Sequence, residues 1–70
     1  MKTKIQELRK KNKLTQEELA EAVGVTRQTI TSLENEKYVA SLILAYKIAV
    51  YFDSSIEEIF DFSEVDDENN

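Results

Sequence analysis

The chain contains neither cysteine nor histidine, and these two absences exclude several kinds of site. Without cysteine there is no disulfide, and without both residues there is no thiolate or imidazole ligand for a zinc ion. The nucleophile–base pairs that depend on histidine are missing as well. The chain has a single glycine, which also excludes a glycine-rich phosphate loop. We therefore expect no metal, no other cofactor and no enzymatic activity.

Proline is absent too, and together with the single glycine this argues against long loops and strands. The 70 residues are enough for one small domain and no more. The longest apolar runs, Leu42–Tyr46 and Ile48–Phe52, are both far too short to cross a bilayer. The N-terminus does not resemble a signal peptide. We expect an all-α cytoplasmic protein with no membrane association.

The net charge of −5 argues at first against a nucleic-acid partner, but the charges are unevenly distributed. Residues 1–37 carry 8 Lys and Arg against 6 Asp and Glu, whereas residues 38–70 carry 1 Lys against 8 acids. Electrostatic steering acts through local patches as well as through the total charge. The N-terminal half is therefore compatible with DNA, and the acidic C-terminal half suits a basic protein partner.

Five helices are predicted from capping residues and from the spacing of apolar side chains. The first covers about residues 3–12. The next two begin at the caps Thr15 and Thr26, the fourth begins at Ser41, and the fifth begins at Ser55. The segments TQEE and SIEE are capping boxes, in which a hydroxyl and a carboxylate each accept a hydrogen bond from the other residue's backbone.

The residues after the fifth helix, 63–70, are acidic and polar. We expect them to form a disordered tail behind a domain of residues 1–62. One interpretation of this tail is a solvated terminus; the other is an electrostatic brake on non-specific DNA binding. A short strand pairing of residues 1–4 with about 60–64 is a further expectation.

Apolar residues at helical spacing mark a small core in the first, second, third and fifth helices. They are Ile5, Leu8, Leu19, Ala20, Val23, Val25, Ile30, Leu33, Ile56, Ile59 and Phe60.

The fourth helix is apolar nearly all round, since Lys47 is the one charged residue from position 42 to position 52. The side chains predicted to fill the core are Leu42, Ala45, Tyr46, Ile48, Ala49 and Phe52. The remaining ones are Ile43, Leu44, Val50 and Tyr51, and an exposed apolar stripe of this kind is typical of a partner surface. We hypothesise a homodimer whose interface draws on Ile43, Val50, Tyr51, Ile56, Phe60 and Phe62.

The segment Leu14–Glu34 has the spacing of a helix-turn-helix. A small residue, Ala20, lies in the first of its helices, and Gly24 follows four positions later at the turn. Ile30 and Leu33 are three apart on the second helix. Gly24 is expected either to take a positive φ or to let the two helices approach closely. A bare helix of this size fits the DNA major groove.

The chain resembles the phage-repressor-type helix-turn-helix regulators, the Cro/C1 or XRE-like family, from about residue 5 to residue 60. The resemblance rests on LR at 8–9, LTQEELA at 14–20, VGV at 23–25, TRQTI at 26–30, LEN at 33–35, SL at 41–42 and IEEIF at 56–60. It implies a compact five-helix bundle of the lambda-repressor-like type, in which the second and third helices form the helix-turn-helix. It also implies binding to operator DNA as a two-fold dimer and regulation of transcription.

The candidate base contacts are the exposed positions of the third helix, Arg27, Gln28, Thr31 and Ser32. Arg27 can pair with guanine O6 and N7, and Gln28 can pair with adenine N6 and N7. Thr31 and Ser32 are shorter and reach a thymine methyl or a water. An ordinary solvated helix face is the alternative interpretation of all four. Thr29 is expected to face partly inward.

The candidate phosphate contacts flank that helix, and they are Gln16, Thr26, Asn35, Lys37 and Tyr38. By resemblance, Gln16 touches a phosphate and braces Gln28, and the loop after the third helix forms a second phosphate clamp. The sequence departs from the family at two positions in this loop. Glu36 stands where glycine is frequent, and Ala40 stands where proline is frequent.

The resemblance also implies a structural ion pair between Arg9 and Glu34, and a direct phosphate contact by Arg9 is the alternative. The cations Lys10, Lys11 and Lys13 either add to the DNA face or offset the dipole of the first helix.

Two functions from different classes remain open. The first is a sequence-specific DNA-binding transcriptional regulator, a dimeric repressor that reads an inverted repeat with the helix beginning near Arg27. The second is a protein-interaction module, such as the antitoxin of a toxin–antitoxin pair, whose acidic half binds a basic toxin.

Overall fold

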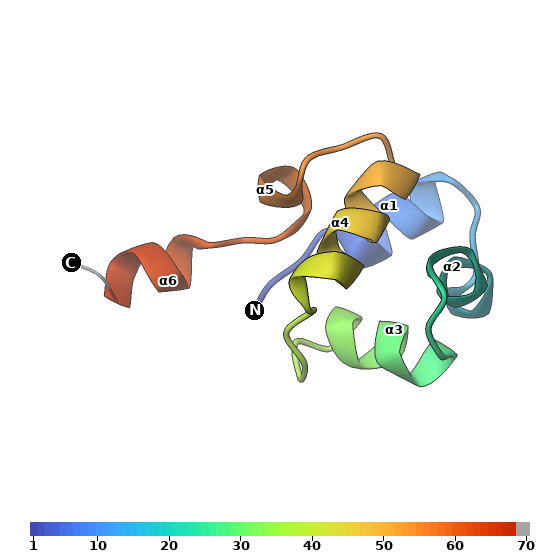
Figure 1. The fold of residues 1–70 in the computed structure, drawn as a ribbon, viewed down its shortest axis with the longest axis horizontal. Coiled ribbons are helices and arrows are strands. Elements are labelled where there is room, and N and C mark those ends of the chain that lie inside the picture. The colour runs from blue at the N-terminus through green and yellow to red at the C-terminus, as the bar shows by residue number, and fades with distance from the viewer. Residues whose placement is uncertain (69–70) are drawn as a thin grey trace.

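The structure is a computed structural model that describes residues 1–68, and that range contains six helices and no β-strand (Figure 1). The helices are α1 (Ile5–Lys11), α2 (Gln16–Val23), α3 (Arg27–Glu34), α4 (Leu42–Tyr51), α5 (Ile56–Ile59) and α6 (Ser63–Glu68). The prediction of an all-α fold is confirmed. Each helix from α2 to α5 begins directly after its predicted capping residue.

Side-chain caps determine where these helices start. In the first capping box, Thr15 Oγ1 accepts a hydrogen bond from the Glu18 N–H at 3.0 Å. The Glu18 carboxylate accepts one in return from the Thr15 N–H at 2.9 Å. The hydrogen bonds of Thr15, first from its backbone and then from its side chain, lower the pKa of Glu18 below its ordinary value. Ser55 forms the second capping box, and Thr26 and Ser41 each accept one backbone hydrogen bond.

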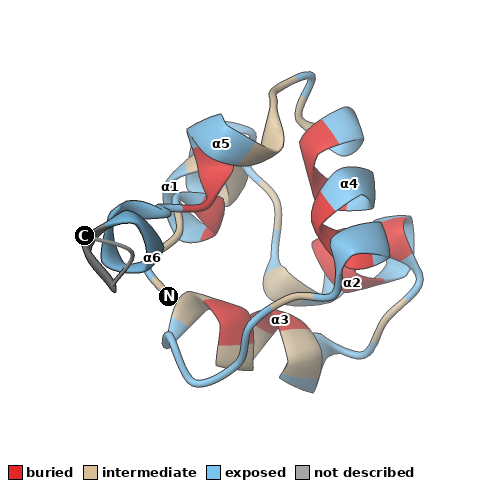
Figure 2. Cartoon of the chain, turned by 60° about the vertical axis from the view of Figure 1, so that its left-hand side comes forward, coloured by how far each residue is buried: buried red, intermediate tan, exposed pale blue. Residues whose placement is uncertain are grey.

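The helices from α1 to α5 turn their apolar faces toward a common core, as the red segments of Figure 2 show. α2 packs against α3 and α4, α1 packs against α3, and α4 packs against α5. The buried side chains are Ile5, Leu19, Ala20, Val23, Ile30, Leu33, Leu44, Ala45, Ile48, Ala49, Ile59 and Phe60. Leu8, Val25 and Ile56, also predicted in the core, are half-buried against it.

The predicted buried face of α4 is partly wrong. Ala45, Ile48 and Ala49 are buried as predicted, but Leu42 is 77% exposed and Tyr46 is 62% exposed. Leu44, predicted on another face, is only 6% exposed. Because this helix is apolar on both sides, the spacing of its apolar residues could not select the buried one.

The two ends of the domain are joined by one antiparallel β-bridge, between Thr3 and Phe60. The Lys4 N–H donates to the Ile59 carbonyl at 2.8 Å, and the Asp61 N–H donates to the Lys2 carbonyl at 2.9 Å. This is the pairing expected between residues 1–4 and about 60–64, reduced to a single bridge. It holds Phe60 in the core at 3% exposure, so Phe60, one of the expected dimer-interface residues, offers almost no surface to a partner.

Four helices are followed by a residue in the left-handed backbone conformation, although the chain has one glycine. Gly24 follows α2 with a φ of 76°, and Lys13, Glu36 and Asp53 follow α1, α3 and α4 with φ values of 58°, 62° and 53°. A Cβ at Gly24 would meet no atom within 4 Å, so the turn requires glycine for its φ and not for close helix approach. This conformation costs a residue with a side chain about 1 kcal/mol.

The segment expected to be a disordered tail contains α6. Figure 1 shows this helix projecting from the body of the domain and away from α3. The projection accounts for the elongated dimensions of the chain, 38 × 22 × 20 Å. Val65 is exposed on α6, and Phe62 is exposed directly before it. Residues 69 and 70 of the expected tail lie outside the described residues.

Substitutions at two leucines test which face of α4 is buried. We expect Leu44→Ala to lower the free energy of unfolding by about 2–4 kcal/mol, because it removes buried methyl groups and leaves a cavity. Leu42→Ala is the matched control and should change it by less than about 0.5 kcal/mol. Urea denaturation, extrapolated to low protein concentration, measures both values. A larger loss for Leu42→Ala would contradict the assignment.

Candidate nucleic-acid interface

The first turn of α3 presents polar side chains to solvent. Arg27 and Gln28 are exposed directly after the cap Thr26, whereas the two apolar residues of the helix are fully buried on its other side. Thr31 and Ser32 lie further along the helix and are half-buried. The helix is therefore held against the core by one face and offers the start of the other face to a ligand.

A shallow groove of about 350 Å³ runs between this face and the loop that follows α3. Its lining consists of Thr26, Gln28, Thr29, Ser32, Lys37 and Tyr38. The groove brings together two of the four candidate base contacts and three of the five candidate phosphate contacts. The candidates outside its lining are Arg27, Thr31, Gln16 and Asn35.

A chain of polar side chains links α3 to the two helices behind it. The Thr31 hydroxyl donates to Gln16 Oε1 at 2.9 Å, and Gln16 Nε2 donates to Glu34 Oε1 at 3.2 Å. Glu34 in turn receives two hydrogen bonds from the Arg9 guanidinium, from Nε at 2.8 Å and from Nη2 at 3.1 Å. Residues of α1, α2 and α3 thus share one network.

The ion pair at the end of this network is largely removed from water. The Arg9 and Glu34 side chains are 11% and 3% exposed. Arg9 Nη1 also donates to the Leu14 carbonyl at 2.9 Å, so the guanidinium is held on three sides. Hydrogen bonding to Glu34 raises the pKa of Arg9 above its ordinary value, against the effect of burial. A phosphate contact by Arg9 would require this pair to open.

The link between Thr31 and Gln16 was not foreseen from the sequence, which assigned Gln16 to Gln28. The Thr31 hydroxyl also lies 3.1 Å from the Arg27 carbonyl, so its single proton is directed into the protein. The sequence shows only that Thr31 and Gln16 are polar residues beside the buried positions of their own helices. Such spacing does not identify a partner on another helix. The network includes two of the candidate DNA contacts.

The exposed cations at the end of α1 remain open to both interpretations, dipole compensation and DNA contact. Lys10 and Lys11 lie in the last turn of α1, and Lys13 follows the helix in the left-handed conformation. All three are exposed. Their position suits both compensation of the helix dipole and contact with a phosphate backbone.

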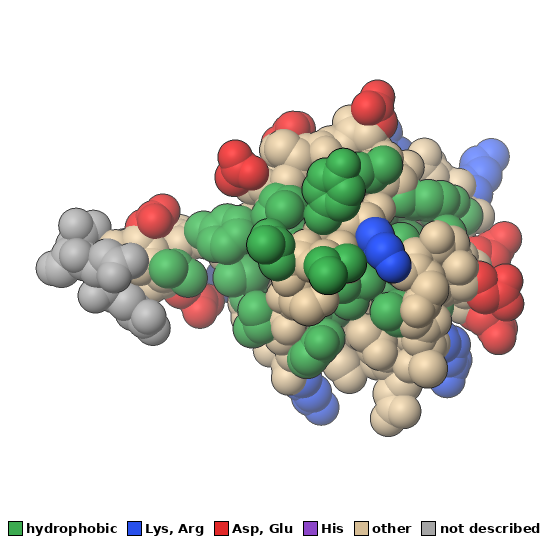
Figure 3. Space-filling view, in the orientation of Figure 1, with side chains coloured by type: hydrophobic (Ala, Val, Ile, Leu, Met, Phe, Trp, Pro, Cys, Tyr) green, Lys and Arg blue, Asp and Glu red, His purple; other side chains and the backbone are tan. Residues whose placement is uncertain are grey.

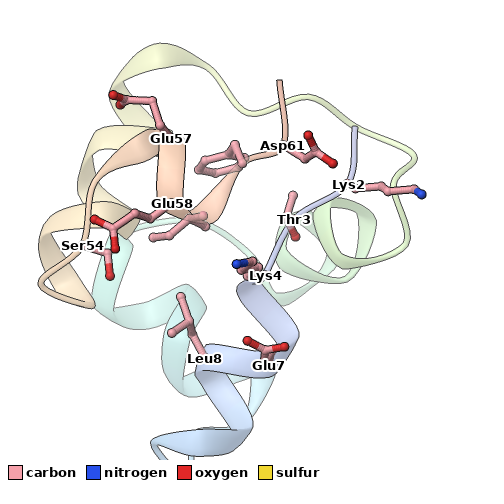
Figure 4. A pocket seen from close by; sticks show the side chains of 11 residues that line it. Lys2, Thr3, Lys4, Glu7, Leu8, Ser54, Glu57, Glu58 and Asp61 are labelled. Carbon is pink, nitrogen blue, oxygen red and sulfur yellow. The ribbon is translucent and has the colours of Figure 1, made fainter. Parts of the chain in front are cut away.

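A second hollow, of about 610 Å³, lies between the N-terminal segment, α1 and α5 (Figure 4). Charged side chains of both signs line it, including Lys2, Lys4, Glu57 and Asp61. The pKa of Asp61 is lowered, first by hydrogen bonding to Ser63 and then by the charges of the two lysines. No residue of α3 lines this hollow.

Two other kinds of site are missing from the described part of the chain. Residues 1–68 contain no cluster of three or more acidic side chains that could hold a metal ion. No helix in that range combines the length and the apolarity needed to cross a membrane.

Comparisons with known proteins agree with the geometry of α2 and α3. A family model described as Helix-turn-helix matches residues 5–59. An uncharacterized HTH-type transcriptional regulator of Archaeoglobus fulgidus is 58% identical over 91% of this chain and 90% of its own length. Another, of Methanothermobacter thermautotrophicus, is 59% identical over 86% of this chain and 88% of its own length. YgzD of Bacillus subtilis, named in the same way, is 48% identical over 86% and 91% of the two chains.

Among solved structures, a chain of the SinR protein/SinI protein complex has a similar fold. It superposes with a TM-score of 0.76 at 25% sequence identity, covering 94% of this chain and 71% of that one. The relatives are named as regulators of transcription, and their family is not one of enzymes.

The network predicts that the contributions of Arg9 and Glu34 to the free energy of unfolding are coupled. We expect Arg9→Met and Glu34→Gln each to lower the free energy of unfolding by about 3 kcal/mol, because each leaves a buried polar partner unsatisfied. Lys10→Met, on the exposed side of α1, is the matched control and should change it by less than about 0.5 kcal/mol. The double variant should lose much less than the sum of the single losses. Additive losses in urea denaturation would contradict the coupling.

Proposed function

This chain belongs to the Cro/C1-type helix-turn-helix family of transcriptional regulators, and from that membership we propose that it is a dimeric repressor that reads an inverted repeat in double-stranded DNA. The observation that carries the proposal is the exposed first turn of α3 beside the groove that ends at Lys37 and Tyr38. The N-terminal residues of a recognition helix are those that enter the major groove. Neither α6 nor the N-terminus covers this turn in Figure 1.

Base recognition is proposed to rest mainly on Arg27 and Gln28, the exposed residues of that turn. Arg27 suits a two-pronged bond to guanine, and Gln28 suits a two-pronged bond to adenine. Ser32 lies in the groove and reaches a thymine methyl or a water. Thr31 donates its proton to Gln16 and retains only acceptor capacity, so it is the weakest of the four candidates.

Phosphate contacts are proposed on both sides of the recognition turn. Gln16 uses one donor on Glu34, and since its amide carries two N–H groups, the second remains suited to a phosphate. The backbone N–H groups at the start of α2 also suit a phosphate. On the other side, Thr26, Lys37 and Tyr38 face one groove, and Asn35 lies exposed at the end of α3.

The dimer interface is proposed on the outer face of α4, where hydrophobic side chains gather in Figure 3. The exposed residues are Leu42, Ile43, Tyr46, Val50 and Tyr51, with Val39 before the helix. These side chains are exposed by between 45% and 77%. Apolar residues gathered in this way are typical of an interaction surface, whereas apolar residues scattered singly are not. Phe62, which is exposed, and Ile56, which is half-buried, are further proposed members of the interface.

A protein partner is the second proposed function, and the distribution of acidic residues favours it. In the C-terminal half up to residue 66, where the structure describes side chains, the exposed acidic residues are Asp53, Glu57, Glu58, Asp61, Glu64 and Asp66. The solved structure with the similar fold is a complex of two different proteins, SinR and SinI. A basic partner, as in an antitoxin pair, would find its complementary charge on the acidic half of this chain.

Selection of bound duplexes from a random DNA pool tests the first function. We expect an inverted repeat to be recovered, and we expect Arg27→Ala and Gln28→Ala each to weaken binding to it by about 1–3 kcal/mol. Lys37→Ala should weaken binding to every sequence alike, because a phosphate contact carries no sequence information. Gln6→Ala, an exposed glutamine of α1, is the matched control. Recovery of random sequence would refute specific recognition.

Sedimentation at micromolar concentration tests the dimer. We expect the mass of two chains for the protein and of one chain for Ile43→Asp, because a carboxylate in the proposed apolar interface would lose its hydration. The fold should persist, since Ile43 is exposed. Gln6→Asp adds the same charge elsewhere and should remain dimeric. A monomeric mass for the unmodified protein would exclude this interface.

A further inference from the structure

Glu36 lies on the proposed DNA surface but has no part in the contacts described above. It follows α3 in the left-handed conformation, with a φ of 62°. Its N–H donates to the Leu33 carbonyl at 3.2 Å, and the next N–H, of Lys37, donates to the Ser32 carbonyl at 2.9 Å. These two bonds form the helix ending for which glycine is the usual residue. The backbone conformation favours glycine at position 36, yet this residue carries a carboxylate.

Glu36 directly precedes the groove along the chain, although it is not part of the lining. The two residues that follow it, Lys37 and Tyr38, line the groove together with α3. Glu36 is itself exposed. Among residues 1–66, whose side chains the structure describes, no cation lies within 4 Å of the Glu36 carboxylate. The Glu36 carboxylate is therefore not held in an ion pair within that part of the chain.

We propose that Glu36 limits the affinity of this surface for the DNA backbone and so weakens binding to all sequences alike. Neighbouring Cα atoms are about 3.8 Å apart, and charges interact over about 8 Å at physiological ionic strength. A phosphate that lies close to the backbone of Lys37 is therefore within range of the Glu36 charge. Phosphates are common to all sequences, so the effect changes the strength of binding and leaves sequence preference unchanged.

This inference rests on the proposed function, and it is distinct from a purely structural role for the loop. Asp53 provides the comparison within the same molecule. It has the same backbone conformation, with a φ of 53°, and a carboxylate of the same charge. It lies in the loop between α4 and α5, at the opposite end of the molecule from α3 in Figure 1. A change at Asp53 therefore alters the same chemistry away from the DNA surface.

The experiment compares Glu36→Gln with Asp53→Asn by fluorescence anisotropy on two short duplexes, one random and one recovered by selection. At about 50 mM salt we expect Glu36→Gln to bind both duplexes roughly three- to tenfold more tightly, because a repulsive charge is removed. The gain should shrink at about 200 mM salt, where such interactions are screened. Asp53→Asn should stay within about twofold of the unmodified protein. Glu36→Lys should bind more tightly still.

Equal affinities of Glu36→Gln and the unmodified protein at low salt would overturn the inference and leave the proposed function intact. A gain confined to the selected duplex would also overturn it, since it would indicate a base contact. An equal gain for Asp53→Asn would overturn it too, because the effect would then come from net charge alone. Absence of binding by every variant to both duplexes would overturn the proposed function together with this inference.

Discussion

The orientation of α3 depends on the buried pair between Arg9 and Glu34. A helix of eight residues has little stability of its own, so its direction must be set by the surrounding structure. Apolar packing holds one face of the helix, but packing alone permits sliding and rotation. The bidentate guanidinium–carboxylate contact at the end of α3 fixes the angle of the helix against α1. The exposed turn at the other end is positioned as a consequence.

Gln16 extends this constraint toward the surface that would meet DNA. Its amide joins the carboxylate of Glu34 to the hydroxyl of Thr31, so the start of α2 is tied to the middle of α3. The same residue stands at a helix N-terminus that suits a phosphate. Contact with the backbone of a duplex and the orientation of the recognition helix are therefore connected through one side chain.

Much of the fold could be predicted because its signals are local. Capping residues at Thr15, Thr26, Ser41 and Ser55 marked four helix starts, since a hydroxyl or carboxylate next to free N–H groups acts within one turn. The sequence allowed Gly24 either a positive φ or a role in close helix approach, and the structure shows the first. The buried face of α4 could not be predicted in this way. It depends on which distant surface packs against the helix, and apolar character is the same on either side of it.

The site was predictable to the same degree. Exposure of Arg27 and Gln28 follows from helical spacing, and resemblance supplied the pairing of Arg9 with Glu34. The hydrogen bond between Thr31 and Gln16 spans fifteen residues and joins two helices, so no spacing rule within one helix reveals it. The sequence therefore identified which residues are polar and outward, but not which of them are already engaged with one another.

The helix ends at Lys13, Glu36 and Asp53 have a consequence for the population of folded chains. Each holds a side chain where the backbone favours glycine. Together they lower the free energy of unfolding by on the order of 3 kcal/mol, and a domain of this kind has about 5–15 kcal/mol in all. The unfolded fraction is then roughly a hundredfold larger than in a chain with glycine at all three. Lifetime in the presence of proteases follows that fraction. The composition of three short loops thus helps to set how long each copy of this small protein survives.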